Sequence, residues 1–164
     1  MPPLRYTVDA ATRGGGLSSA RTRQATVEFD TSAGQSETHM GPADLLATAF
    51  AACVLKNVER FSGILPFRYD GASISVTAER EDRPPRISQI RYVLRIRTDE
   101  PAQRVDLLRR NIERFGTIFN TLSAACRVVG EIVAEPPGAL TPAAAHPRAA
   151  DVGTPGDGVP ARDI

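Results

Sequence analysis

The stretch GPADLLATAFAACVLKNVERF, residues 41–61, decides how the rest of the chain is interpreted. Pro42 suits the first turn of a helix, and Asp44 suits the positive end of a helix dipole. Gly63 follows as a stop signal, so the pattern predicts a helix from about 42 to about 62. Apolar side chains recur at helical spacing and form one stripe along it, namely Leu46, Phe50, Val54, Val58 and Phe61.

Cys53 lies at the edge of that stripe, about 60° from Phe50 on a wheel of about 100° per residue. Lys56 and Arg60 fall further round on the same side. A nearby cation raises the thiolate fraction of a thiol, so this position permits a reactive cysteine. Free cysteine is also among the most buried residue types, so the position equally suits a small core residue. The spacing alone leaves both interpretations open.

The sequence on both sides of this helix contains strand and helix patterns in an order typical of α+β proteins. Alternation of apolar and polar residues predicts strands at 4–10 and 23–30, a hairpin of 69–82 and 86–99, and a last strand at 126–135. Helices are predicted at 101–115 and 117–125, separated by Gly116. Strands and helices do not alternate regularly, which excludes a parallel α/β sheet and favours α+β.

The long apolar helix also predicts an assembly. One small sheet can cover only part of a helix of this length, so we expect a homodimer in which residues 42–62 are buried between the subunits. Residues 137–164 are rich in Pro, Ala and Gly and have no apolar period. They are predicted to be a disordered tail, which leaves residues 1–136 as the single folded domain.

The charge pattern argues against a nucleic-acid partner. The chain of 164 residues has a net charge of +1, although 20 residues are basic and all but Lys56 of these are arginine. An arginine-rich nucleic-acid module therefore ranks as a third interpretation. Three arginines share one face of the second hairpin strand and are expected to pair with glutamates across the sheet. The arginines are Arg91, Arg95 and Arg97, and the candidate partners are Glu79, Glu131 and Glu135.

Other function classes find little support in the sequence. The N-terminus has no apolar signal region, and the long helix contains charged residues, so we expect a cytoplasmic protein without a membrane partner. Two cysteines in a reducing compartment are a poor disulfide framework. The sequence has no CxxC, no paired histidines and no phosphate-binding loop, so neither a metal nor a cofactor is predicted.

The segment GPADLLATAFAAC resembles the osmotically inducible protein and organic hydroperoxide resistance (OsmC/Ohr) family. In that family a Pro-acidic-x-Leu helix start leads through small residues to Ala-Ala-Cys or Ala-Gly-Cys. The order of the later elements is also similar, so the resemblance covers roughly residues 4–135. It implies antiparallel sheets around a long central helix and an intertwined homodimer with two sites at its interface. It also implies a thiol peroxidase that reduces organic hydroperoxides.

The resemblance assigns roles to individual residues. Cys53 would be the nucleophile that attacks the peroxide oxygen as thiolate and becomes a sulfenic acid. The arginine of the family comes from the N-terminal sheet and matches Arg21 or Arg23, while Arg13 resembles the arginine of the hydroperoxide-resistance branch. The usual glutamate position holds alanine. Asp44 follows one residue later, where a role at the helix start suits it better than contact with the thiol.

The family's second, resolving cysteine is missing. Alignment places Gly116 at its position, and Cys126 lies ten residues further on, across a helix. No catalytic disulfide between Cys53 and Cys126 is therefore expected, and an external thiol would have to reduce the sulfenic acid. The alternative is a non-catalytic or redox-sensing relative that binds a small apolar ligand at the dimer interface.

Overall fold

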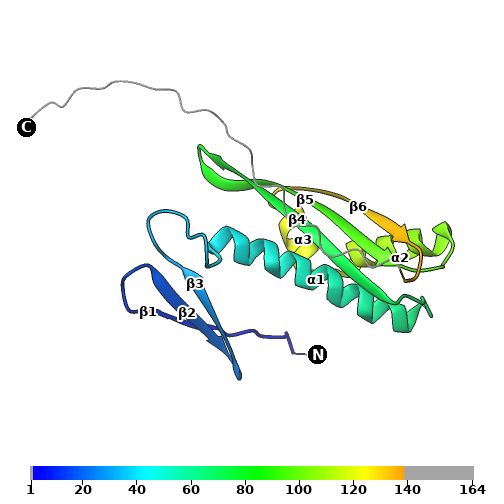
Figure 1. Cartoon of the computed structure of the whole chain (residues 1–164), viewed down its shortest axis with the longest axis horizontal. Coiled ribbons are helices and arrows are strands. Elements are labelled where there is room, and N and C mark those ends of the chain that lie inside the picture. The colour runs from blue at the N-terminus through cyan, green and yellow to red at the C-terminus, as the bar shows by residue number, and fades with distance from the viewer. Residues whose placement is uncertain (1, 139–164) are drawn as a thin grey trace, which may run out of the picture.

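The computed structural model describes residues 2–138, which form two sheets and three helices (Figure 1). The α+β class is therefore confirmed. The predicted tail lies outside the described residues from residue 139 onward, so it stays a prediction. The elements in chain order are β1 (Asp9–Thr12), β2 (Leu17–Thr22), β3 (Ala25–Asp30), α1 (Pro42–Ile64), β4 (Gly71–Asp82), β5 (Pro85–Arg97), α2 (Ala102–Phe115), α3 (Thr117–Ser123) and β6 (Arg127–Glu135).

The N-terminal sheet differs from the prediction in its strands. It is antiparallel in the order β1-β2-β3, with the first strand later than the predicted 4–10. β2 was not predicted, because its sequence LSSART has one large apolar side chain and no alternation. Arg23 joins β2 to β3 with a φ of 54°, a conformation that glycine or asparagine adopts more readily. No glycine or asparagine therefore marks this turn in the sequence.

The second sheet has the order β4-β5-β6. β4 and β5 pair antiparallel from Gly71 opposite Arg97 to Asp82 opposite Pro85, which confirms the hairpin. β6 pairs with β5 in parallel, so the expectation of purely antiparallel sheets is wrong for this strand. The connection explains this. Helices α2 and α3 lie between β5 and β6 and bring the chain back to the end of the sheet where β5 starts, so β6 runs in the same direction as β5.

Helix α1 starts and buries its side chains much as its sequence predicts. The backbone N–H of Gly41 donates to Oδ2 of Asp44 at 2.9 Å, so the carboxylate closes the first turn. The helix ends at Ile64, two residues beyond the predicted end. Leu46 is only half-buried, and the buried residues of the helix are Phe50, Val54, Asn57, Val58 and Phe61. None of the helices within residues 2–138 combines the length and apolarity needed to cross a bilayer.

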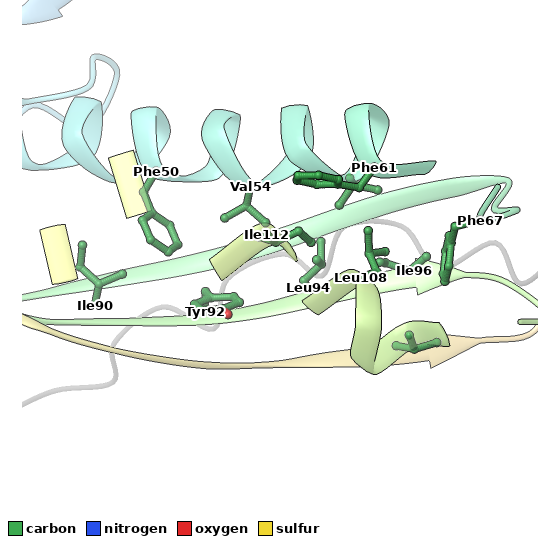
Figure 2. Packing of buried hydrophobic residues seen from close by; sticks show 12 residues of the cluster. Phe50, Val54, Phe61, Phe67, Ile90, Tyr92, Leu94, Ile96, Leu108 and Ile112 are labelled. Carbon is green, nitrogen blue, oxygen red and sulfur yellow. The ribbon is translucent and has the colours of Figure 1, made fainter. Parts of the chain in front are cut away.

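The core lies between α1, the inner face of the second sheet and α2 (Figure 2). Phe50 anchors it from the helix, with its ring centroid 5.4 Å from that of Tyr92 and 5.7 Å from that of Phe119. The remaining buried apolar residues are Val54, Val58, Phe61, Phe67, Ile90, Leu94, Ile96, Val105, Leu108 and Ile112. Packing of one α1 face against this sheet fixes the rotation of the helix, and so fixes where Cys53 points.

The arginines on the outer face of β5 are paired across strands. Arg91 lies 2.8 Å from a carboxylate oxygen of Glu79, and Arg95 lies 3.3 Å from one of Glu135, as the sequence predicted. Arg97 pairs instead with Asp70, at 2.8 Å. Because each charge has a partner, this face offers no row of free cations to a phosphate backbone.

Candidate active site

Cys53 lies midway along α1 and is half-buried, at the edge of the core rather than inside it. The turn between α2 and α3 lies close to it. A Cβ atom added to Gly116 would lie 3.5 Å from the Sγ of Cys53. The structure therefore places the thiol against the residue that the sequence aligned with the resolving position of the OsmC/Ohr family.

The glycine at this turn is required by a close approach of backbone. The same added Cβ would lie 2.8 Å from the carbonyl oxygen of Ile112 and 2.9 Å from Cβ of Phe119, both closer than normal contacts. The N–H of Gly116 donates to that Ile112 carbonyl at 3.0 Å, and the glycine carbonyl accepts from Asn120 N at 2.8 Å. These bonds fix the shape of the turn between α2 and α3.

Asn57 is a site residue that the sequence analysis missed. Its side-chain Nδ2 donates to the carbonyl of Cys53 at 2.8 Å and lies 3.7 Å from the Sγ of the same residue. The signal was present in the sequence, because a polar residue interrupts the apolar stripe one turn after the cysteine. A buried amide in such a stripe calls for an explanation.

The cations of α1 do not contact the thiol directly. Lys56 and Arg60 are both exposed, as the helical wheel indicated. The guanidinium carbon of Arg60 lies 5.3 Å from the ring centroid of Phe61, so this charge rests on an aromatic face. Within the described residues, no hydrogen bond or ion pair links either cation to Cys53.

The other predicted site residues are separate from Cys53 in the single chain. Arg21 lies in β2 and Arg23 in the β2–β3 turn; both are exposed, as is Arg13 in the β1–β2 turn. Figure 1 shows this sheet as a layer beside the N-terminal end of α1. Asp44 is nine residues before Cys53, about 13 Å along a helix at 1.5 Å per residue, and its carboxylate caps the helix.

Cys126 lies just after α3, outside helix α1. It follows α3, where its N–H donates to the carbonyl of Leu122 at 2.8 Å, and it packs at the border of the core. Both cysteines are free thiols. Cys126 therefore fits the role of a small, partly buried packing residue.

An open groove lies elsewhere, between the segment that precedes α1 and the tip of the β4–β5 hairpin. Cys53 does not line it. Asp30 organises the segment, since its carboxylate accepts from the backbone of Ser32 at 2.9 Å and of Ser36 at 3.0 Å. Hydrogen bonds from Ser32, then from Ser36, hold the pKa of Asp30 below its ordinary value. Titratable and charged residues lining the groove are Asp30, His39, Asp44, Arg80 and Arg86.

The N-terminal sheet leaves apolar side chains in solvent. Every residue of β1 is exposed, and the segment before it exposes Tyr6 by 79%. The large apolar residues exposed in the N-terminal region are Leu4, Tyr6, Val8, Leu17 and Val27. The register of β2 and β3 puts Leu17 and Val27 on opposite faces of the sheet, so both faces expose apolar side chains.

Solved structures share this architecture at low sequence identity. An OsmC-like protein from Mycoplasma pneumoniae superposes with a TM-score of 0.71 and 17% identity, covering 79% of this chain and 98% of that chain. An organic hydroperoxide resistance protein OsmC from Legionella pneumophila gives a TM-score of 0.61 and 14% identity, covering 80% of this chain and 99% of that chain. The organic hydroperoxide resistance protein OhrB of Bacillus subtilis gives 0.58 and 16%, with 79% and 98% covered.

No curated protein matches the sequence. The structural likenesses therefore establish the fold, and the family rests on a separate comparison. A family model described as OsmC-like protein matches residues 34–130, more than half of the chain, and the matched range includes α1 with Cys53 and the turn at Gly116. The chain belongs to the OsmC-like protein family.

Proposed function

We propose that this protein is a thiol-dependent peroxidase that reduces organic hydroperoxides through Cys53, in defence against oxidative stress. The observation that carries the proposal is the position of the thiol: it is half-buried on the central helix and lies against Gly116. A half-buried position leaves the thiol a path to a substrate, which a nucleophile needs. Membership of the OsmC-like family supports the same assignment.

The chemistry takes three steps. The Cys53 thiolate attacks the outer oxygen of a hydroperoxide, the O–O bond breaks, and the leaving alkoxide takes up a proton to become an alcohol. The sulfur is thereby oxidised to a sulfenic acid and the peroxide is reduced. A first external thiol then displaces water from the sulfenic acid and forms a mixed disulfide. A second external thiol releases Cys53 and leaves as part of a disulfide.

Gly116 is the reason for assigning the reductant to an outside molecule. The residue that abuts the Cys53 thiol carries no sulfur, and Cys126 is bonded into the end of α3 instead. Reduced thiols are abundant in the cytoplasm, where we expect the protein to work.

A homodimer would complete the site. Apolar side chains of the N-terminal sheet and of the segment before it are exposed in the single chain, and the face of α1 opposite the core is exposed as well. Packing of this sheet on a second subunit would bury both surfaces. It would also carry the candidate arginines, Arg21 and Arg23, away from their own Cys53 and toward that of the partner. A guanidinium there would favour the thiolate.

The test is steady-state consumption of an organic hydroperoxide in the presence of a small thiol. We expect turnover by the natural chain and by Cys126→Ser, and none by Cys53→Ser. Arg21→Gln and Arg23→Gln should be compared: the variant that loses the arginine near the thiol should consume the hydroperoxide more slowly. Equal rates for the natural chain and Cys53→Ser would overturn the proposal.

A non-catalytic or redox-sensing role is the second candidate, and one observation favours it. Within the described part of the chain, the side-chain hydrogen bonds to Cys53 come from Asn57, and no ion pair or hydrogen bond joins it to a cation. In this role the protein would bind a small apolar ligand at the dimer interface. A Cys53 that oxidises once with peroxide but is not recycled by any thiol would distinguish this role from that of a peroxidase.

A further inference from the structure

Asn57 holds the Cys53 residue at two points. The Nδ2 atom of an asparagine carries two hydrogens, and here one is directed to the Cys53 carbonyl at 2.8 Å while the sulfur lies within 3.7 Å of the same nitrogen. The asparagine is 7% exposed, so its amide is fixed among apolar neighbours rather than free in water. One fixed group therefore reaches both the backbone and the sulfur of the cysteine.

We propose that Asn57 is a positioning residue for Cys53, which donates a hydrogen bond to the thiolate and restricts the side-chain rotamer of the cysteine. This inference rests on the proposed function, since it assigns a task within the same site. A donor directed at an ionised acceptor stabilises the charged form more than the neutral one. In a partly buried site this donor takes over part of the solvation that water supplies to an exposed thiolate.

A purely structural role for Asn57 predicts a different behaviour. Asparagine side chains in helices often bond the carbonyl four residues earlier, without any tie to chemistry. The chain contains a matched example in α2, where Nδ2 of Asn111 donates to the carbonyl of Leu107, also at 2.8 Å. Among the described residues, no hydrogen bond joins Asn111 to a sulfur. Asn111→Leu is therefore the control for loss of such a bond by itself.

The experiment measures the thiolate of Cys53 directly and without peroxide. In a Cys126→Ser background Cys53 is the single thiol, so its alkylation rate by iodoacetamide and its ultraviolet thiolate absorbance at neutral pH are unambiguous. The variants are Asn57→Leu, which removes the polar group, and Asn57→Asp, which keeps the size but removes both N–H donors. Circular dichroism and thermal melting establish that each variant is folded.

We expect both Asn57 variants to slow alkylation about threefold or more and to lower the thiolate absorbance in proportion, because a bond to a charged group is lost. Asn111→Leu should leave both readings unchanged. Alkylation within about twofold of the background for the folded Asn57 variants would overturn the proposal. An equal loss in Asn111→Leu would also overturn it. Failure of the natural chain to react with peroxide would count against the peroxidase function alone.

Discussion

Gly116 places no side chain beside the Cys53 sulfur, so in the proposed reaction this position offers no thiol to reduce Cys53. A Cβ at this position would lie 3.5 Å from the Cys53 sulfur, close to the reach of a disulfide. Gly116→Cys should therefore form a bridge between residues 53 and 116 after one equivalent of peroxide. Because the added Cβ would lie 2.8 Å from the Ile112 carbonyl oxygen and 2.9 Å from Cβ of Phe119, the backbone of the turn has to shift before this bridge closes.

Non-reducing mass analysis of Gly116→Cys measures the outcome, with Gly116→Ser as the control for the added bulk. The expected result is loss of two hydrogens within one chain and a cross-linked peptide pair that includes Cys53. Persistence of free thiols, or a bridge to Cys126 instead, would show that the turn does not lie against the thiol.

Tyr92 titrates far from its ordinary range. Burial, and to a lesser extent the charge of Glu113, raises the pKa of Tyr92 to about 12 from 10.0. The fold favours the neutral phenol, so its contribution to stability is complete below the unfolded pKa and is lost as the pH rises through the folded pKa. We expect the free energy of unfolding to fall between about pH 10 and about pH 12.

Denaturant titrations across this interval, with Tyr92→Phe as the matched variant, measure the Tyr92 effect. The phenylalanine keeps the ring contacts with Phe50 and Phe119 but has no proton to lose. Its pH slope should be shallower than that of the natural chain. Identical slopes for the two proteins would contradict the assigned burial of the phenol.

Only part of the candidate site is visible from sequence. The spacing puts Cys53 at the edge of the helical stripe, and its proposed role as nucleophile comes from the resemblance to the OsmC/Ohr family. The same periodicity assigns Asn57 to the core and cannot reveal a side chain that turns back to the preceding turn. Nor can periodicity say whether Arg21 or Arg23 approaches Cys53, since both belong to the N-terminal sheet and its turn.

At the scale of elements, α1 depends on one aromatic anchor. Phe50 is fully buried and touches the rings of Tyr92 and Phe119. Phe50→Ala should lower the free energy of unfolding by about 3–5 kcal/mol, because it removes a large side chain and leaves a cavity. Ile64→Ala is the control on the same helix; at 60% exposure it should cost about 0.5 kcal/mol or less. Chemical denaturation measures both changes. Equal losses in the free energy of unfolding for the two variants would mean that α1 does not pack on the sheet through the face that contains Phe50.

The predicted elements are those with strong periodicity. The hairpin of β4 and β5 and the helices α1 and α2 have long regular patterns, and all were located from sequence. β2 was missed since small polar residues at a sheet that is open to solvent need not alternate. The parallel pairing of β6 was missed because strand direction depends on the path of α2 and α3, which no local pattern encodes.

At the scale of the whole molecule, the N-terminal sheet predicts a dimer. A second copy of the chain could bury its exposed apolar side chains and the exposed face of α1. Sedimentation at micromolar concentration should show a dimer, and Val27→Asp in β3 should shift it toward monomer. Ser73→Asp, on the outward face of β4, should leave the dimer intact. A monomeric natural chain would contradict the assembly.

The central claim is that Cys53 is the thiol that reacts with hydroperoxides, and trapping of its sulfenic acid tests this most directly. The natural chain would be mixed with an organic hydroperoxide or with hydrogen peroxide in the presence of dimedone, and the adduct located by peptide mass mapping. The account predicts an adduct on Cys53, formed faster with the organic hydroperoxide, and little or none on Cys126. An unmodified Cys53, or equal labelling of both cysteines, would contradict it.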